Sequence, residues 1–409
     1  MPGPPREAIN FPISALDKVQ KERPDMKKDS IARLQVRKNQ IRGMATKQRL
    51  TVGLDLGDRT SRYCILDEAG EKVNEDKLPT TKAGLMAMFG KMPACRIALE
   101  VGTHSPWVSH ELAELGHEVV VANAHRVKLI TQSVKKNDRI DAERLARLAR
   151  VDPKLLSPIQ HRGREAQADL AVIRARATLV DARTELVNSA RGLAKPMGER
   201  LKKCDADYVK ESLAEGMGKA VQAAIRPLLK SVEEISKQIS EYDQKIEGIS
   251  KRYPEMKVLT QVYGVGTLIA LTYILTIEDP NRFEHSRDVG PYLGLTRKQR
   301  DSGDSEPELR ISKAGDQLLR RLLVQGAHCI MRQGAPDSDL RAWGMGRLQS
   351  NGEDNQGGKK GKNKPKISKT RKKKTIVAIA RKLAVLLHRL WVTGEVYDPQ
   401  YNRKLAQAA

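Results

Sequence analysis

Residues 51–56 read TVGLDL, a short run of apolar and β-branched residues with one aspartate near its end. Such a run predicts a buried β-strand, because β-branched side chains favour extended backbone and short apolar runs are typical of sheet interiors. Asp55 stands out within it, since a buried carboxylate costs free energy unless a cation or hydrogen bonds compensate it. This stretch is therefore the first indication of both the fold and the site.

The residues on the C-terminal side of this strand predict a mixed sheet with helices on its faces. We expect further strands at residues 61–66, 71–73, 96–100 and 118–121, helices at residues 81–91 and 140–150, and another helix that opens at Pro106. Three successive strands followed by alternating helices and strands favour such a sheet. This order matches the RNase H-like fold, in which the first and fourth strands are neighbours.

Residues 165–250 show no strand pattern and predict two long helices that form a coiled coil. Apolar residues recur at three- and four-residue spacing over 170–187 and 228–249, and such a seam requires a partner helix. We expect Pro196 and Gly198 to end the first helix and Pro227 to lie at the start of the second. The spacing leaves the partner open, because an antiparallel hairpin and a contact between two chains fit it equally well.

A second compact region, mainly helical, is predicted beyond residue 253. A Gly-Val-Gly turn at Gly264 and Gly266 precedes an apolar helix at residues 268–275, and the backbone amides of such a turn can hold a DNA phosphate. Further helices are predicted over residues 311–331 and 375–391. The last of these is amphipathic and is expected to pack back onto this region.

The charge of the chain indicates a polyanionic partner. Its 409 residues include 74 Lys and Arg against 50 Asp and Glu, a formal net charge of +24, which favours nucleic acid. No apolar run approaches the roughly 20 residues of a membrane-spanning helix. The four cysteines form no Cys-x-x-Cys pair, which argues against a zinc site and a disulfide scaffold. We therefore expect a cytoplasmic protein without a membrane partner.

Four acidic residues follow a pattern that suits metal binding. Glu100 ends its predicted strand as Asp55 does. Asp138 and Asp141 open a predicted helix and are three residues apart, so they share one face of it. Clustered carboxylates cannot all stay ionised without cations, so we expect Asp55, Glu100, Asp138 and Asp141 to bind divalent metal, with two Mg²⁺ ions at a scissile phosphodiester. Asp141 alone could equally be a helix N-terminal acid favoured by the dipole.

A basic loop at residues 294–305 contains Ser302, with no histidine beside it in sequence. A serine in such a loop is usually a turn former, so composition alone does not make Ser302 a nucleophile. Basic residues and glycines in and beyond this loop are candidate nucleic-acid contacts: Gly264, Gly266, Arg297, Lys298, Arg300, Arg310, Lys313, Arg320, Lys359, Lys360, Lys372 and Lys373.

Together, these stretches resemble the transposases of the insertion-sequence "one-ten" family, the RNA-guided bridge recombinases. Residues 52–55, 97–100 and 137–141 are similar to its RuvC-like domain, which carries Asp, Glu, Asp and Asp in this order. The C-terminal transposase domain of the family resembles a second set of stretches in this chain: the glycine turn and residues 292–295, 301–303, 310–316 and 380–384. The family commonly has Ser-Ser-Gly where this chain has Asp301-Ser302-Gly303, so Ser302 matches the nucleophile and Ser305 is a weaker alternative.

The resemblance implies a mechanism and a set of partners. A structured noncoding RNA would pair with donor and target DNA, the carboxylates would hold Mg²⁺, and serine would form a covalent phosphoserine link. Family members work as homodimers that assemble into tetramers on DNA, associated with the nucleoid. Three rivals remain: a metal-dependent Holliday-junction-type nuclease without serine chemistry, an actin-like ATPase suggested by the phosphate-hairpin pattern of residues 53–61, and a noncatalytic RNA-binding scaffold.

The predicted domain organisation combines α/β and all-α parts. It consists of a basic leader at 1–50 with Met44 as a candidate internal start, a RuvC-like catalytic domain at 51–155, a helical coiled-coil linker or dimerisation region at 156–252, a serine-bearing transposase domain at 253–343 plus 375–398, a disordered basic loop at 344–374 and a tail at 399–409.

Overall fold

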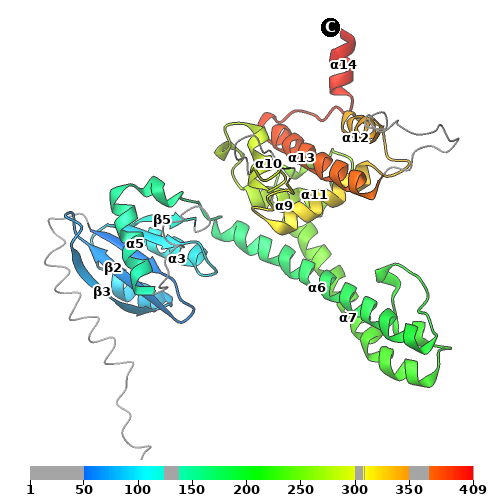
Figure 1. Ribbon diagram of the computed structural model, residues 1–409, viewed down its shortest axis with the longest axis horizontal. Coiled ribbons are helices and arrows are strands. Elements are labelled where there is room, and N and C mark those ends of the chain that lie inside the picture. Colours follow the sequence, from blue (N-terminus) through cyan, green and yellow to red (C-terminus); the bar gives the residue numbers. More distant parts are fainter. Residues whose placement is uncertain (1–49, 124–137, 300–306, 308, 350–367, 409) are drawn as a thin grey trace, which may run out of the picture. The chain divides into compact units, whose positions relative to one another are not determined.

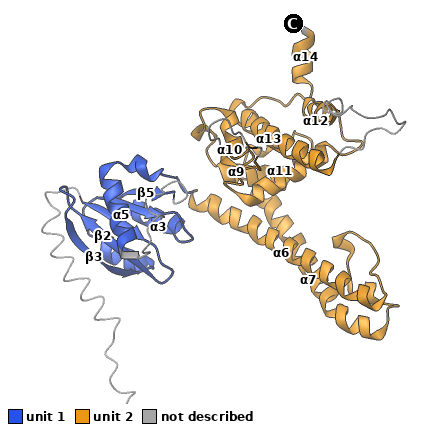
Figure 2. Ribbon diagram, in the orientation of Figure 1, with its two compact units in different colours: residues 1–161 blue, residues 162–409 orange. Residues whose placement is uncertain are grey.

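A computed structural model of the chain describes residues 50–123, 138–299, 307, 309–349 and 368–408. The chain divides into two compact units, residues 1–161 and 162–409 (Figures 1 and 2). The first contains the predicted sheet, and the second contains the long helices and the C-terminal region. None of the described helices combines the length and the apolar composition that crossing a bilayer requires.

The first unit is built on a five-stranded mixed sheet. Its strands are β1 (Thr51–Asp55), β2 (Thr60–Leu66), β3 (Lys72–Pro79), β4 (Arg96–Glu100) and β5 (Glu118–Ala122). They lie in the order β3-β2-β1-β4-β5. The β1–β2 and β2–β3 pairs are antiparallel, whereas β1–β4 and β4–β5 are parallel. The mixed sheet and the neighbouring positions of the first and fourth strands are therefore confirmed.

The strand β3 is longer than the sequence predicts. It continues to Pro79, whereas its apolar pattern ends near Val73. The strand pairs with β2 at the edge of the sheet and is mostly polar. Polar and charged side chains protect an edge strand from pairing with other chains, so burial patterns do not reveal such a strand.

Helices cover both faces of this sheet. They are α2 (Lys82–Phe89), α3 (Ser105–Glu114) and α5 (Asp138–Val151). Val52 and Leu54 of β1 belong to the same core as residues of α2 and α3. Because side chains alternate between faces along a strand, Gly53 lies on the opposite face, under α5. A Cβ atom at Gly53 would lie 1.9 Å from the carbonyl oxygen of Ala142, so only glycine allows α5 to approach β1 this closely.

The second unit begins with two long helices, α6 (Arg164–Ala194) and α7 (Lys219–Ser250). They pack against each other in opposite directions. Near the root of the pair, Arg252 binds Asp169 at 2.5 Å, and further along, Arg176 binds Asp243 at 2.9 Å. The structure thus shows the antiparallel hairpin within one chain, one of the two predicted alternatives. The first helix ends just before Pro196, as predicted.

The second helix begins eight residues earlier than predicted, so Pro227 lies inside α7 and not at its start. An internal proline removes one backbone hydrogen bond and costs about 3 kcal/mol. Val221 and Ile225, on the N-terminal side of the proline, are fully buried in a small core at the tip of the hairpin. Burial of such side chains stabilises by about 1.5–3 kcal/mol each, which outweighs the proline.

The C-terminal part of the second unit is a helical domain. Its helices are α8 (Met256–Leu259), α9 (Thr267–Ile277), α10 (Val289–Tyr292), α11 (Gln317–Ile330), α12 (Asp339–Gln349), α13 (Lys369–Thr393) and α14 (Tyr401–Ala408). Every residue of α9 from Ile269 to Ile277 is buried. The Tyr273 hydroxyl donates a hydrogen bond to the Ala384 carbonyl at 2.7 Å, so α13 packs back onto this core as predicted.

Three boundaries in this domain correct the sequence prediction. The helix expected from residue 311 begins at Gln317, because Lys313 and Gly315 have positive φ angles and Asp316 caps the helix. The predicted basic loop at 344–374 is helical at both ends, in α12 and α13. The tail at 399–409 contains α14. Lysine and arginine are good helix formers, so a basic composition is compatible with a helix. The Ser368 side chain accepts a hydrogen bond from the Arg371 amide at 3.2 Å and caps the start of α13.

Candidate active site

Two of the predicted carboxylates end neighbouring parallel strands. The register pairs Leu54 of β1 with Leu99 of β4, so Asp55 and Glu100 occupy the next position on each strand. Both residues are half-buried. Because the two strands run in the same direction, both carboxylates lie at one edge of the sheet. Side-chain alternation places them on the face that carries Gly53 and Ala98, which is the face covered by α5.

The helix α5 brings a third carboxylate to this edge. The Arg96 guanidinium, at the start of β4, donates a hydrogen bond to the Ala149 carbonyl near the C-terminal end of α5 at 3.0 Å. The helix therefore runs antiparallel to β4, and its N-terminus lies toward the carboxyl ends of β1 and β4. Asp141 is in this first turn, directly before Ala142, and its side chain is 16% exposed. Asp138 opens the helix, but its side chain lies outside the described part of the structure.

Positive charge surrounds these carboxylates. The β1–β2 register places Arg62 directly opposite Asp55, and Arg144 Nη1 lies 3.8 Å from Asp141 Oδ1. The N-terminus of α5 adds the positive end of the helix dipole. Sequence reasoning missed Arg62. Its place across from Asp55 follows from the length of the β1–β2 turn, which becomes clear only when both strand ends are known.

The donor set suits a hard divalent cation, because such ions prefer carboxylate oxygens. Asp55, Glu100 and Asp141 all supply this ligand type. Within the described residues, however, no three or more His, Cys, Asp or Glu side chains form a group that could hold a metal ion. Of the four predicted ligands, Asp138 has its side chain outside the described residues.

Cys64, on the strand next to β1, is not suited to nucleophilic chemistry. Cys64 pairs with Gly53 in the β1–β2 register and is buried. Burial raises the pKa of the Cys64 thiol to about 11. A thiol with this pKa stays protonated near neutral pH and is unreactive. Cys64 therefore serves as a small buried apolar residue.

The arms of the serine loop form a short antiparallel ribbon in the second unit. Lys298 N donates to Arg310 O at 3.0 Å, Ser312 N donates to Thr296 O at 2.8 Å and Lys313 N donates to Gly294 O at 3.1 Å. A Cβ atom at Gly294, where φ is +66°, would lie 2.3 Å from the Ala314 nitrogen. The ribbon base is therefore tightly closed. Arg300, Ser302, Ser305, Lys359 and Lys360 lie outside the described residues.

The described candidate contacts differ in their surroundings. Arg320 Nη1 donates to the carbonyls of Leu293 at 3.0 Å and Ala314 at 2.6 Å, one on each arm of the ribbon, and burial lowers the pKa of this guanidinium. Arg320 therefore braces the ribbon. Exposed side chains are found at Arg297, Lys298, Arg310 and Lys313 on the ribbon and at Lys372 and Lys373 in α13.

The glycine turn has a packing role in the structure. Gly264 has a φ of +86°, and a Cβ atom there would lie 2.9 Å from the Gly326 carbonyl of α11. Gly266 precedes α9 in an extended conformation without a side-chain cap. The turn therefore joins α8 to α9, as predicted, and lets α11 approach.

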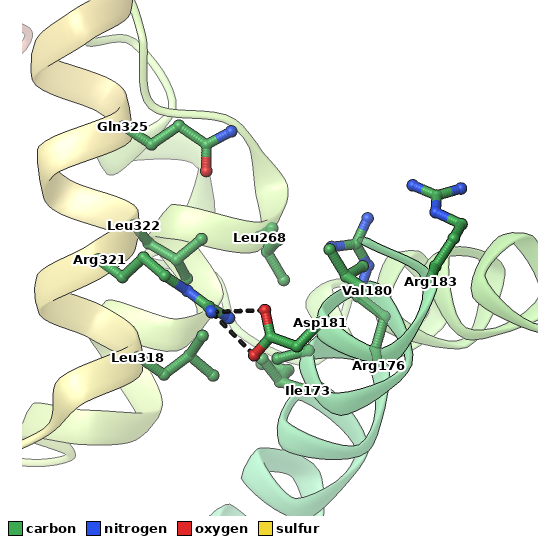
Figure 3. A pocket seen from close by; sticks show the side chains of 11 residues that line it. Ile173, Arg176, Val180, Asp181, Arg183, Leu268, Leu318, Arg321, Leu322 and Gln325 are labelled. Carbon is green, nitrogen blue, oxygen red and sulfur yellow. Dashed lines mark hydrogen bonds and ion pairs between the residues drawn. The ribbon is translucent and has the colours of Figure 1, made fainter. Parts of the chain in front are cut away.

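A pocket of about 430 Å³ lies between α6 and α11 (Figure 3). Apolar side chains such as Val180, Leu268 and Leu318 line it, and an ion pair between Arg321 and Asp181 crosses it with two contacts of 2.8 and 2.9 Å. The other lining arginines have acidic partners on the hairpin. The Arg321–Asp181 pair therefore joins the hairpin to the helical domain, whereas the pairs made by Arg176 and Arg183 lie within the hairpin.

The chain resembles known proteins in both parts. The DEDD transposase model of the IS110 group, described as "Transposase", matches residues 52–196, which include Asp55, Glu100, Asp138 and Asp141. A second model, described as "Transposase IS116/IS110/IS902 family", matches residues 256–341, which include Ser302.

Curated relatives agree with these matches. "Transposase for insertion sequence element IS1111A" of Coxiella burnetii is 26% identical over 71% of this chain and 80% of its own length. "Probable family 20 transposase" of Pseudomonas aeruginosa is 28% identical over 73% and 89%. "Transposase for insertion sequence element IS1328" of Yersinia enterocolitica is 26% identical over 73% and 89%.

A carboxylate-edged mixed sheet followed by a separate helical domain, with these two matches, defines a DEDD-type transposase. The chain belongs to the IS110 family of insertion-sequence transposases.

Proposed function

We propose that this protein is a DNA recombinase that cuts and rejoins the DNA of an insertion sequence. The observation that carries the proposal is the placement of Asp55, Glu100 and Asp141 at one edge of the sheet, in the part of the chain that matches the DEDD transposase model. The strand order also supports an RNase H-like fold for the first unit. DNA is then the substrate, and the net charge of +24 favours its binding.

In this proposal Asp55, Glu100, Asp138 and Asp141 hold divalent metal, as two Mg²⁺ ions. When bound, such ions supply Lewis-acid stabilisation of the charge that develops on a scissile phosphate. Asp55 and Glu100 come from adjacent strands of one sheet, so the register sets the relative positions of their backbones. Asp141 approaches from α5, which Gly53 allows to lie directly on β1.

The second chemical group in the proposal is Ser302. Its hydroxyl oxygen attacks the phosphorus, the bond from phosphorus to one DNA oxygen breaks, and that oxygen leaves as a hydroxyl that has gained the serine proton. The phosphoserine link keeps the phosphodiester energy until a hydroxyl of the partner strand attacks it and releases the serine. The ribbon braced by Arg320 supports a fixed position for the loop arms, and exposed Arg297, Lys298 and Arg310 suit phosphate contacts.

A structured noncoding RNA is the proposed guide, pairing with donor and target DNA while the protein contacts backbones. The excess of basic residues supports this division of roles, because backbone contacts need charge and no base-specific code. We also propose a homodimer that assembles into a tetramer on DNA, associated with the nucleoid.

The test uses the full chain with Mg²⁺, RNA transcribed from the ends of its own element, and plasmids that carry donor and target sequences. We expect Asp55→Ala and Glu100→Ala to lose strand cleavage, while Asp67→Asn, in the β2–β3 turn, serves as the acidic control. Ser302→Ala should lose the covalent protein–DNA adduct that denaturing gels detect.

Each rival predicts another result. Cleavage without any covalent adduct would favour a metal-dependent nuclease, and binding of RNA without cleavage would favour a scaffold. Hydrolysis of ATP that depends on Asp55 would favour an actin-like ATPase. Normal recombination by Ser302→Ala would refute the serine assignment.

A further inference from the structure

Two loops follow the carboxylate-bearing strands, and a histidine joins them. Asp58 lies three residues after Asp55, and His104 lies four residues after Glu100. His104 Nε2 is 3.3 Å from Asp58 Oδ1. Because β1 and β4 are parallel neighbours, both loops leave the sheet at the edge where the carboxylates lie.

Trp107 fixes the orientation of this histidine. The indole Nε1–H of Trp107 donates a hydrogen bond to His104 Nδ1 at 3.0 Å, and the two rings meet edge to face with centroids 6.2 Å apart. Since Nδ1 accepts this bond, the proton of the neutral imidazole lies on Nε2. Trp107 packs against the main core of the first unit, so His104 presents an Nε2–H donor from a rigid support.

The loops on both sides of His104 are also held in place. Ser105 Oγ accepts the Gly102 amide at 2.9 Å and contacts His161 Nε2 at 2.9 Å, which fixes the connection from β4 to α3. On the other side, Thr80 Oγ1 donates to the Gly57 carbonyl at 2.9 Å. The donor therefore has a defined position in the loop that follows Glu100.

The present acceptor of this donor is a weak one. The Asp58 side chain is 88% exposed, so water competes for its oxygens and the contact adds little stability. The hydrogen bond from Trp107 thus orients a donor whose own partner contributes almost nothing. The arrangement suits an acceptor that comes from outside and is anionic, as Asp58 is.

We propose that His104 Nε2–H binds a phosphodiester oxygen of the DNA strand that enters the carboxylate site, in place of Asp58. The inference rests on the proposed function, since it needs DNA at this edge of the sheet. A phosphate beside Asp55, Glu100 and Asp141 meets several negative charges, and a fixed donor at the rim offsets part of that repulsion. His104 is a substrate-positioning residue in this scheme, and no bond is made or broken at it.

The experiment measures cleavage by the full chain under the same conditions as above, at varied plasmid DNA concentration. We expect His104→Ala to raise the KM for DNA by roughly tenfold or more, because a hydrogen bond to a charged group is lost. His104→Gln should recover part of this loss, since its amide N–H can reach a similar position. Asp58→Ala should lower the KM, because the competing carboxylate is gone.

The outcomes separate the possible roles. If Asp58→Ala is as defective as His104→Ala, the bond between them is a structural brace and the inference is wrong. It is equally wrong if His104→Ala has the KM of the native chain. Asp55→Ala in the same assay tests the proposed function itself, because cleavage by that variant refutes the carboxylate site. If Asp55→Ala loses cleavage while His104→Ala keeps the native KM for DNA, only the histidine role is refuted. Thermal melting of each variant reports whether the first unit is folded.

Discussion

The contact between Gly53 and α5 gives the sharpest prediction for the first unit. In Gly53→Ala the new Cβ would lie 1.9 Å from the Ala142 carbonyl oxygen and 2.5 Å from the Ala146 nitrogen. Carbon and carbonyl oxygen atoms approach to about 3.3 Å at the closest, so the helix must retreat by about 1.4 Å. Overpacking of this kind costs about 1–3 kcal/mol. Misplacement by about 1 Å can lower a rate by about 100-fold, and α5 carries Asp141.

Hydrogen exchange of the α5 amides measures the first effect, and DNA cleavage measures the second. A loss of about 1–3 kcal/mol should speed exchange roughly five- to 150-fold for amides that exchange through an opening equilibrium. Gly192→Ala is the matched control, because a methyl group there meets nothing within 4 Å and the site is within α6. Normal exchange and normal cleavage in Gly53→Ala would refute the placement of α5 on β1, and with it the shared carboxylate edge.

Further predictions concern charged residues. Arg320→Ala should reduce covalent adduct formation, because both arms of the ribbon lose their brace. The ion pair of Arg321 is exposed, so Arg321→Ala should change the free energy of unfolding by less than about 1 kcal/mol. Equal effects of the two variants in adduct and melting assays would contradict this prediction. Hydrogen bonds from neighbouring lysine and arginine side chains lower the pKa of Glu143, so its contribution to stability is present above the usual glutamate pKa and is lost as pH falls through the lowered value. Acid titration of Glu143→Gln should lack this component, and an unchanged acid profile would argue against it. Replacing exposed Lys372 and Lys373 by alanine should flatten the salt dependence of DNA binding by about 0.9 per lost phosphate contact, and an unchanged slope would mean that neither lysine contacts DNA.

The buried parts of the sheet could be predicted from the sequence because burial leaves a local pattern. The strands β1, β4 and β5 are short apolar runs, and Asp55 and Glu100 are conspicuous because they interrupt or end such runs. A polar edge strand has no such pattern, which explains why most of β3 was missed.

Interactions between distant residues could not be predicted in the same way. Arg320 resembles an ordinary basic surface residue in sequence, and only the paired arms of the ribbon show which carbonyls it binds. Likewise, Trp107, His104 and Asp58 are unremarkable until the loops after β1 and β4 are known to be neighbours. Basic composition also predicted a loop at residues 369–374, where the structure has the start of α13. Lysine and arginine favour helix, so charge alone does not distinguish a loop from an exposed helix.

The length of the α6–α7 hairpin sets a distance scale for the second unit. A helix of 31 residues, such as α6, extends about 46 Å at 1.5 Å per residue. One turn of duplex DNA measures about 34–36 Å. The hairpin has a separate small core at its tip, around Val187, Val221 and Ile225, so the tip is a folded end and not a frayed one. Arg321 of α11 pairs with Asp181, and the 13 residues of α6 beyond this contact (182–194) extend about 20 Å. A partner that grips this tip is therefore held about half a turn of duplex away from the helical domain.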